Sequence, residues 1–170
     1  MSRSVYITRL AKFLPNEPIA NEEIEDILGK INGKASRAKS IILRSNQIKT
    51  RYYAIDRQGN STHTNAQLAK EAILNLTDER FKAEDIQLLA CGTSSPDQIL
   101  PSHTSMVQGE LKAAPTEIVA TSGACCNIIQ SLKYSFMSIQ GGFTDNAVCV
   151  GSERMSHWMV SKYFQEEAEK

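Results

Sequence analysis

The chain has 170 residues, with 19 basic and 19 acidic side chains, so its net charge is zero when the histidines are neutral. This length is sufficient for one domain with a substantial hydrophobic core, and the balanced charge argues against a protein that binds nucleic acid over its whole surface. No apolar run reaches the ~18 residues that cross a bilayer, and residues 1–15 lack the long apolar region of a signal peptide.

The first part of the chain predicts a strand followed by two helices. Alternating side chains over residues 5–14 predict the strand. A helix is expected to begin at Asn21, which would cap it, and to end at Gly33. A second, shorter helix over residues 36–43 and a short strand over residues 51–55 are expected next. The apolar face of the first helix is formed by Ile24, Ile27, Leu28 and Ile31.

The middle of the chain alternates helix and strand. A helix follows the polar loop 59–65, and a continuous apolar run over residues 86–91 predicts a strand that is buried on both faces. Another helix is expected to begin at Pro101 and Ser102, and a strand to follow over residues 117–120. The first of these helices has its apolar side formed by Leu68, Ala69, Ala72, Ile73 and Leu76. The alternation predicts an α/β fold with a mainly parallel sheet and helices on both of its faces.

The stretch 121–153 carries the strongest functional signal. Small residues lead into Cys125, and a helix is expected to follow until Gly141–Gly142. Its apolar stripe is formed by Ile128, Ile129, Leu132, Phe136 and Ile139. A short buried strand is expected over residues 147–150, and a polar helix over residues 162–170. Cys125 is thus expected on a turn at the N-terminus of a buried helix, where the helix dipole and free backbone N–H groups favour the thiolate.

A cysteine in an α/β protein is more often a packing residue than a nucleophile. Two features favour chemistry at Cys125: the preceding small residues leave room for a substrate, and the strand–turn–helix setting follows the logic of a nucleophile elbow. Cys126 is turned by roughly 100° around the helix and is expected to pack. The histidines are His63, His103 and His157. Their spacing places none of them beside Cys125, so the general base that a thiolate nucleophile needs stays unassigned.

The four cysteines, which include Cys91 and Cys149, contain no CxxC pair, so neither a metal site nor a redox motif is predicted. Cys91 and Cys149 lie in apolar strand-like runs and are expected to act as small packing residues. A disulfide between the neighbours Cys125 and Cys126 is geometrically awkward. Such a set is typical of the reducing cytoplasm, where we expect the protein to reside.

A basic stretch lies in the first third of the chain. Between Lys34 and Ile55 there are six basic residues and no acidic one. They are Lys34, Arg37, Lys39, Arg44, Lys49 and Arg51. The stretch is either a solvated basic face or a site for the phosphates of a cofactor or a carrier arm. Position in the sequence does not separate the two.

The run from Leu100 to Met155 resembles the N-terminal half of a β-ketoacyl-acyl-carrier-protein synthase III. In that family a small-residue turn presents the nucleophilic cysteine, and a long helix, a glycine break and a strand ending in Gly-Ser-acidic follow, as at residues 151–153 here. The stretch 91–102 resembles the family's Ser- and Thr-rich loop before a Pro-Ser helix start. The resemblance covers nearly the whole chain, and it is strongest around Cys125 and weaker before Gly59.

The resemblance implies a thiolase fold, with residues 1–170 as a single domain that forms the N-terminal half and with the C-terminal half absent. It implies an acyltransferase in which a thioester acylates Cys125 and a malonyl thioester on acyl carrier protein then loses CO₂ and attacks the acyl group. No bound cofactor is implied, because coenzyme A or the phosphopantetheine of the carrier protein holds the substrates. The implied partners are acyl carrier protein and a second copy in a homodimer, with no membrane or nucleic acid.

The resemblance also indicates further site residues. Leu100 matches the position that reaches across a dimer into the partner's acyl pocket, and strand 117–120 lies where two subunits pair. Further candidate substrate-binding residues are Arg44, Arg51 and His157. In many members a Trp and an Arg hold the adenine of coenzyme A, but Ile41 and His157 occupy those positions here. This favours an acyl group delivered by a carrier protein, in fatty-acid initiation or in the synthesis of a polyketide or dialkylresorcinol.

The family's catalytic His and Asn are expected beyond Lys170, as is the fifth strand of the first half. We therefore expect this chain alone to be inactive and to have unpaired strand edges and exposed apolar surface. One alternative is a non-catalytic thiolase-fold partner subunit, which would not need the His and the Asn. Another is a different condensing enzyme of the superfamily, such as a hydroxymethylglutaryl synthase or an alkene-pathway enzyme.

Overall fold

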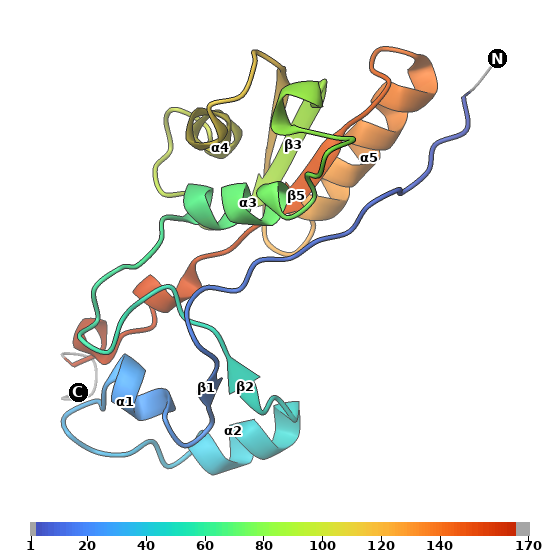
Figure 1. Ribbon diagram of the computed structural model, residues 1–170. Helices are drawn as coiled ribbons and strands as arrows, with labels where there is room; N and C mark the ends of the chain where they lie inside the picture. The colour runs from blue at the N-terminus through green and yellow to red at the C-terminus, as the bar shows by residue number, and fades with distance from the viewer. Residues whose placement is uncertain (1–2, 166–170) are drawn as a thin grey trace. The chain divides into compact units, whose positions relative to one another are not determined.

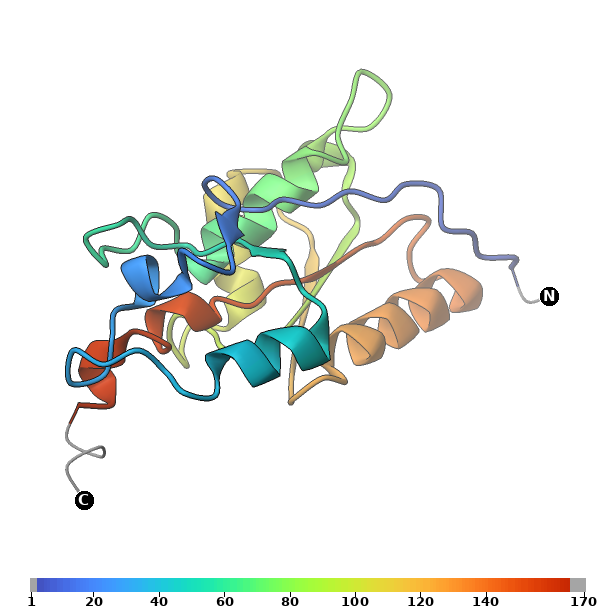
Figure 2. The ribbon, with the colours of Figure 1, turned by 90° about the horizontal axis from the view of Figure 1, so that it is seen from below.

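The computed structural model describes residues 3–165, and the chain divides into two compact units. Unit 1 comprises the N-terminal residues up to Phe13 and the segment Asn65–Glu153. Unit 2 comprises Leu14–Thr64 and the residues from Arg154 onward. Figures 1 and 2 show the elements of both units along the chain. Within residues 3–165, no helix is both long enough and apolar enough to cross a membrane.

Unit 1 is built around three parallel strands in the order β4-β3-β5. Its strands are β3 (Leu88–Thr93), β4 (Glu117–Ser122) and β5 (Val148–Gly151), and its helices are α3 (Asn65–Leu74), α4 (His103–Leu111) and α5 (Asn127–Gly141). Helices α3 and α4 cover one face of the sheet and α5 covers the other (Figure 1). This arrangement confirms the predicted α/β class with a parallel sheet between helices. Because the strands are parallel, their carboxyl ends meet at one edge of the sheet.

The main hydrophobic core lies between the sheet and the pair α3 and α4. Strand β3 is buried along its whole length, as its continuous apolar run predicts. It begins at Leu88, two residues later than expected, because Ile86 closes a short 3₁₀ turn, η1 (Ala83–Asp85). The core residues are Ala66, Ala69, Ile73, Ile86, Leu89, Cys91, Val107, Val148 and Val150. Alternate residues of β3 and β5 enter this core, so the residues between them face α5.

Helix α5 packs on its face of the sheet through small and polar side chains. Its buried residues are Asn127, Ser131, Ser135 and Ser138. The predicted apolar stripe is wrong as a buried face, because Ile129, Leu132 and Phe136 are 62%, 42% and 44% exposed. The helix begins at Asn127 and ends at Gly141, with Gly142 as the left-handed cap, so its predicted end is confirmed.

The strands explain why the serine face of α5 is the buried one. A Cβ placed on Gly92 would lie 2.7 Å from backbone atoms of Asn127 and Ile128, and one on Gly151 would lie 3.1 Å from the Ile128 side chain. The first turn of α5 therefore lies almost directly on the backbones of β3 and β5. At such a separation Ile128 fits only against the bare backbone of Gly151 and the other contacts along α5 are made by small side chains, so Ile129, Leu132 and Phe136 face away from the sheet.

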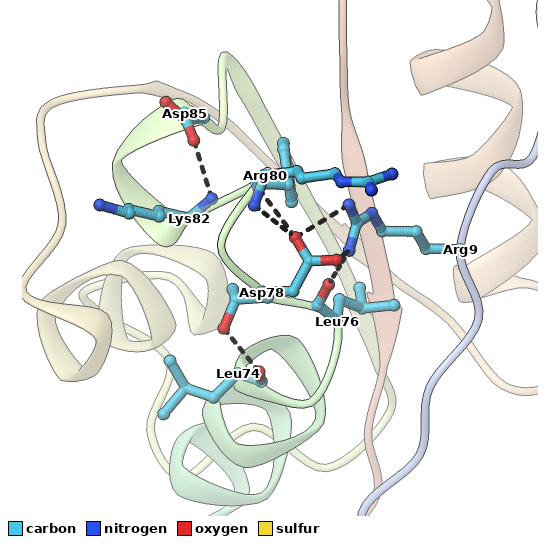
Figure 3. Close-up of polar contacts among 9 residues, drawn as sticks. Arg9, Leu74, Leu76, Asp78, Arg80, Lys82 and Asp85 are labelled. Carbon is cyan, nitrogen blue, oxygen red and sulfur yellow. Dashed lines mark hydrogen bonds and ion pairs between the residues drawn. The ribbon is translucent and has the colours of Figure 1, made fainter.

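The predicted strand over residues 5–14 is wrong, because residues 3–15 form no strand. The segment is held to unit 1 by side chains instead of by a ladder of backbone hydrogen bonds. Arg9 donates to the Leu76 carbonyl at 3.0 Å and to both carboxylate oxygens of Asp78, at 2.6 and 3.1 Å (Figure 3). Asn75 donates to the Lys12 carbonyl at 3.0 Å. An alternating extended segment becomes a strand only where a neighbouring backbone pairs with it.

Unit 2 consists of short elements around a small core of Ile27, Tyr53, Ile55 and Val160. Strands β1 (Ile19–Ala20) and β2 (Thr50–Arg51) pair antiparallel, the helices are α1 (Ile24–Leu28) and α2 (Lys39–Asn46), and the 3₁₀ turns are η2 (Met155–His157) and η3 (Ser161–Tyr163). Helix α2 and strand β2 are thus shifted from the predicted ranges 36–43 and 51–55. Of the helix predicted over residues 162–170, residues 162 and 163 belong to the 3₁₀ turn η3 and residues 164 and 165 to no helix, so no α-helix forms over residues 162–165. Residues 166–170 lie outside the described part of the chain.

The first predicted helix is present but shorter than expected. Asn21 does not cap it, because its side chain accepts a hydrogen bond from Arg51 at 2.5 Å and the residue before the helix is Glu23. The helix ends at Gly29, with φ of +81°, and not at Gly33. Gly29 thus supplies a positive φ, which glycine adopts readily, at the end of this helix, four positions earlier than the sequence pattern indicates.

Candidate functional site

Cys125 lies on an exposed turn between the end of β4 and the start of α5. Its φ is +64°, that of Gly123 is +141°, and the Cys126 N–H donates to the Ala124 carbonyl at 2.8 Å. The predicted position, a turn directly before a helix N-terminus, is confirmed. A non-glycine residue with positive φ costs on the order of 1 kcal/mol or more and persists only where its surroundings hold it. The turn therefore exposes Cys125 at an energetic cost, and a cysteine that only packs in the core does not require such a backbone conformation.

Cys91 and Cys149 are less exposed than Cys125, whereas Cys126 is exposed as Cys125 is. Burial raises the pKa of Cys91 to about 12 and that of Cys149 to about 11, so both are thiols at neutral pH. Cys91 is part of the core, which confirms the packing role predicted for it. Cys126 was expected to pack but is exposed, because the side chains of α5 that contact the sheet begin one residue later, at Asn127. Its sulfur accepts a hydrogen bond from Gln130 at 3.6 Å.

Behind the turn, Glu153 joins the carboxyl ends of β3 and β5 to the start of α5. Its carboxylate accepts hydrogen bonds from the Ser94 N–H at 2.6 Å and the Ser95 hydroxyl at 2.6 Å. It also accepts longer bonds from the Thr93 hydroxyl at 3.4 Å and the Asn127 amide at 3.3 Å. Burial acts to raise the pKa of Glu153, but the hydrogen bonds from Ser95, Ser94 and Asn127 outweigh it and lower the pKa from its ordinary value. Glu153 is therefore a carboxylate at neutral pH.

The roles of Ser94, Ser95 and Asn127 were not predicted from the sequence. Of these residues and Glu153, only Glu153 belongs to a recognised motif. Ser95 and Asn127 precede Glu153 by 58 and 26 positions, and nothing in the sequence indicates that residues so far apart are in contact. One signal was present: Ser94 and Ser95 directly follow the buried strand, at the edge where polar groups gather in α/β folds.

His103 is buried at the carboxyl end of β5, where its Nε2 lies 3.0 Å from the Ser152 hydroxyl. Burial lowers its pKa, while the charges of Asp97 and Glu153 oppose this shift. The imidazole is therefore neutral at neutral pH. Asn65 donates to the Thr93 hydroxyl at 2.9 Å and to the Ser152 carbonyl at 3.3 Å, so the same strand ends are joined from the α3 side as well.

The structure places Leu100 in unit 1, in the loop that follows β3, where the residue is 81% exposed. This loop starts at the same sheet edge as the Cys125 turn. The remaining candidate residues, Arg44, Arg51 and His157, all belong to unit 2.

In unit 2, Arg44 is exposed in the last turn of α2, and Arg51 lies in β2 and is bonded to Asn21. His157 lies in η2, with its ring 6.2 Å from that of Tyr163 in an edge-on arrangement. Within the basic stretch, Lys39 forms an ion pair with Glu25 at 3.2 Å. Across residues 3–165, no group of three or more His, Cys, Asp or Glu side chains is arranged to hold a metal ion.

No family model matches the chain. Among curated proteins, it is 27% identical over 155 residues to the β-ketoacyl-[acyl-carrier-protein] synthase III of Chlorobaculum tepidum, which covers 88% of this chain and 43% of the relative. It is 28% identical over 155 residues to the protein of the same name from Porphyra purpurea, which covers 91% of this chain and 44% of the relative. The chain thus spans less than half the length of the relatives that it matches, which fits their N-terminal half.

Solved structures show the same likeness. The 3-oxoacyl-[acyl-carrier-protein] synthase III of Aquifex aeolicus matches with a TM-score of 0.69 and 24% identity, over 86% of this chain and 44% of that one. A Xanthomonas campestris OleA variant matches with a TM-score of 0.61 and 19% identity, over 79% of this chain and 38% of that one. The chain therefore has the fold of the N-terminal part of thiolase-type enzymes, and over most of its length it is similar to β-ketoacyl-[acyl-carrier-protein] synthase III.

Proposed function

We propose that this chain supplies the acyl-accepting cysteine of a condensing enzyme and that Cys125 is that residue. The observation that carries the proposal is the exposed thiol on a left-handed turn between β4 and the N-terminus of α5. A nucleophile needs this exposure, and the N-terminal end of a 15-residue helix favours negative charge on a nearby sulfur. The similarity to β-ketoacyl-[acyl-carrier-protein] synthase III over most of the chain supports the same reaction class.

The proposed reaction is a decarboxylative Claisen condensation in two steps. In the first, Cys125 gives up its thiol proton and its sulfur attacks the carbonyl carbon of an acyl thioester. The new C–S bond to Cys125 forms, the C–S bond to the carrier breaks, and the departing carrier sulfur takes up the proton that Cys125 gave up. In the second, a malonyl thioester on acyl carrier protein loses CO₂, and the electron pair of the broken C–C bond attacks the acyl carbonyl and releases Cys125. The Cys125 N–H is the proposed donor to the oxyanion, because the Cys126 N–H is already bonded to Ala124.

The substrate side of the proposal follows the resemblance. We assign no resident cofactor, because coenzyme A or the phosphopantetheine arm of acyl carrier protein would bring the acyl groups. Leu100, which is 81% exposed, suits a residue that is buried only by a second subunit of a homodimer. The proposed substrate-binding residues of unit 2 are Arg44, Arg51 and His157. Residues 1–170 would form the N-terminal half of a cytoplasmic enzyme of fatty-acid initiation or of polyketide or dialkylresorcinol synthesis.

Two adjacent cysteines allow a matched test in the natural full-length protein. Condensation of an acyl thioester with malonyl-acyl carrier protein is measured for the Cys125→Ala and Cys126→Ala variants. We expect Cys125→Ala to lose activity by at least about 10³-fold, since it removes the nucleophile. The Cys126→Ala variant is expected to stay within about threefold of the wild-type rate, because its side chain lies outside the packed face of α5. Equal rates for the two variants would contradict the assignment.

A further inference from the structure

The turn that presents Cys125 needs an external support. Gly123 and Cys125 have φ of +141° and +64°, so two residues of this short turn have a positive φ. An isolated segment of this kind would relax to ordinary backbone angles, because positive φ is unfavourable for cysteine. The neighbouring structure must therefore fix both ends of the turn.

Ser94, at the carboxyl end of β3, contacts both ends. Its hydroxyl donates to the Gly123 carbonyl at 3.4 Å, at the beginning of the turn, and accepts from the Asn127 amide at 3.2 Å, at the end of the turn. The Asn127 side chain also accepts from the Ile128 N–H at 2.6 Å, and the residue is only 5% exposed. Ser94 and Asn127 thus hold the two sides of the turn at a fixed separation.

Glu153 in turn holds Ser94 and Asn127 together. One oxygen of its carboxylate, Oε1, accepts from both of them, at 2.6 Å from the Ser94 N–H and at 3.3 Å from the Asn127 amide. Its other oxygen accepts from the Ser95 hydroxyl at 2.6 Å, which fixes the orientation of the carboxylate. Hydrogen bonds to a charged acceptor are about twice as strong as those between neutral groups. Among the hydrogen bonds described here for Ser94, Ser95, Asn127 and Glu153, the charged partner is Glu153.

We propose that Glu153 is a positioning residue for Cys125, which acts through Ser94 and Asn127 to hold the turn in the conformation that exposes the sulfur. Its importance for catalysis rests on the proposed function, but whether Glu153 holds the turn can be tested without any condensation assay. Glu153 does not touch the reacting sulfur itself. Its role is to keep the turn from relaxing.

The test measures amide hydrogen exchange of the segment 121–131 in the natural full-length protein, together with the iodoacetamide labelling rates of Cys125 and Cys126. The Glu153→Ala variant removes every acceptor oxygen, and we expect exchange in the turn to rise about tenfold, as loss of a charged hydrogen bond predicts. We expect the ratio of Cys125 to Cys126 labelling to fall as well. The Glu153→Gln variant keeps one acceptor oxygen for the Ser94 N–H, so its exchange rate in the turn should lie between that of the wild type and that of Glu153→Ala.

The matched control is Asp78→Ala, because Asp78 is another carboxylate of unit 1 that accepts backbone N–H groups, those of Arg80 and Phe81. It lies in the loop that leads to the amino end of β3, so its loss should leave exchange in the turn unchanged. Wild-type exchange and labelling ratios in Glu153→Ala, or an equal change in the control, would overturn the inference. The proposed function fails separately, if Cys125→Ala keeps its condensation activity, and the exchange result still decides the role of Glu153.

Discussion

Gly92 and Gly151 are the residues that let α5 begin directly above the sheet. A Cβ on Gly92 would meet the Asn127 carbonyl carbon and the Ile128 nitrogen at 2.7 Å, and neither backbone atom can move without shifting the helix. The position of Cys125 depends on this contact, because the helix that follows the cysteine starts there. The candidate site therefore depends on glycine at positions 92 and 151, because a larger residue would push the start of α5 away from the sheet.

Replacement of Gly92 tests this contact at the residue scale. We expect Gly92→Ala to lower the free energy of unfolding by about 1–3 kcal/mol, the usual cost of an added methyl group in a tightly packed region. Gly109, inside α4, is the control, since a Cβ there would have no heavy atom within 4 Å. Gly109→Ala should raise the free energy of unfolding by about 0.5–1 kcal/mol through helix propensity. Urea unfolding measures both, and a Gly92→Ala variant as stable as wild type would contradict the packing account.

At the scale of elements, the segment 3–13 shows how an extended chain is held without a sheet. Arg9 and Asp78 form a two-point ion pair, and Asp78 also accepts from the Arg80 and Phe81 N–H groups (Figure 3). The hydrogen bond from Arg9, followed by that from the Arg80 backbone, lowers the pKa of Asp78 from its ordinary value of 3.8. The pair and the loop turn therefore depend on the same ionised carboxylate.

This dependence predicts how the segment responds to pH. A carboxylate with a lowered pKa contributes stability that is fully present above its ordinary pKa of 3.8 and is lost as the pH falls through the lowered value. We expect Asp78→Asn to unfold at a lower temperature than wild type at neutral pH, and the difference to vanish under strongly acidic conditions. Thermal unfolding across this pH range measures it.

The control for this pair is Asp145→Asn, which breaks the ion pair between Arg3 and Asp145 on the same segment. Those two side chains are 53% and 74% exposed, so solvent screens their interaction and little change is expected at any pH. A constant difference between Asp78→Asn and wild type at all pH values would show that the ionised carboxylate is not what stabilises the loop.

Elements whose sequence signal is local were predictable, and those that depend on distant partners were not. The buried strand β3, the helix start at Ser102 and the turn at Cys125 follow from runs of apolar residues, a cap and small residues. The strand expected over residues 5–14 failed because its alternation says nothing about a pairing partner. The prediction that the apolar stripe of α5 is buried was wrong, because hydrophobicity does not report the space that the sheet leaves. The close contact at Gly92 and the serines along α5 determine that the serine face lies against the sheet.

The candidate site was predictable only in part, for the same reason. The turn around Cys125 is encoded within a few residues, whereas its support comes from Ser94 and Glu153, which the chain brings together from 59 positions apart. The remaining candidates, Arg44, Arg51 and His157, belong to the other unit. Single-sequence patterns do not report such long-range contacts, although they do indicate the sheet edge at which polar groups gather.

At the scale of the whole molecule, the chain combines a parallel-sheet unit that contains Cys125 with a second unit that contains the basic stretch. It spans 43% and 44% of the two curated relatives that it matches. The sheet and the cysteine turn agree with the thiolase-type fold. The proposed function depends on whether Cys125 accepts the acyl group. That claim concerns a covalent bond, so it can be observed without any substitution.

The most direct measurement is the location of the acyl adduct. The natural full-length protein is incubated with an acyl thioester in the absence of the malonyl substrate, digested at low pH to preserve thioesters, and mapped by mass spectrometry. The account predicts the added acyl mass on the peptide that contains Cys125, with fragmentation placing it on that sulfur, and loss of the adduct when malonyl-acyl carrier protein is then added. An adduct on Cys126 or another residue, or no adduct at all, would contradict it.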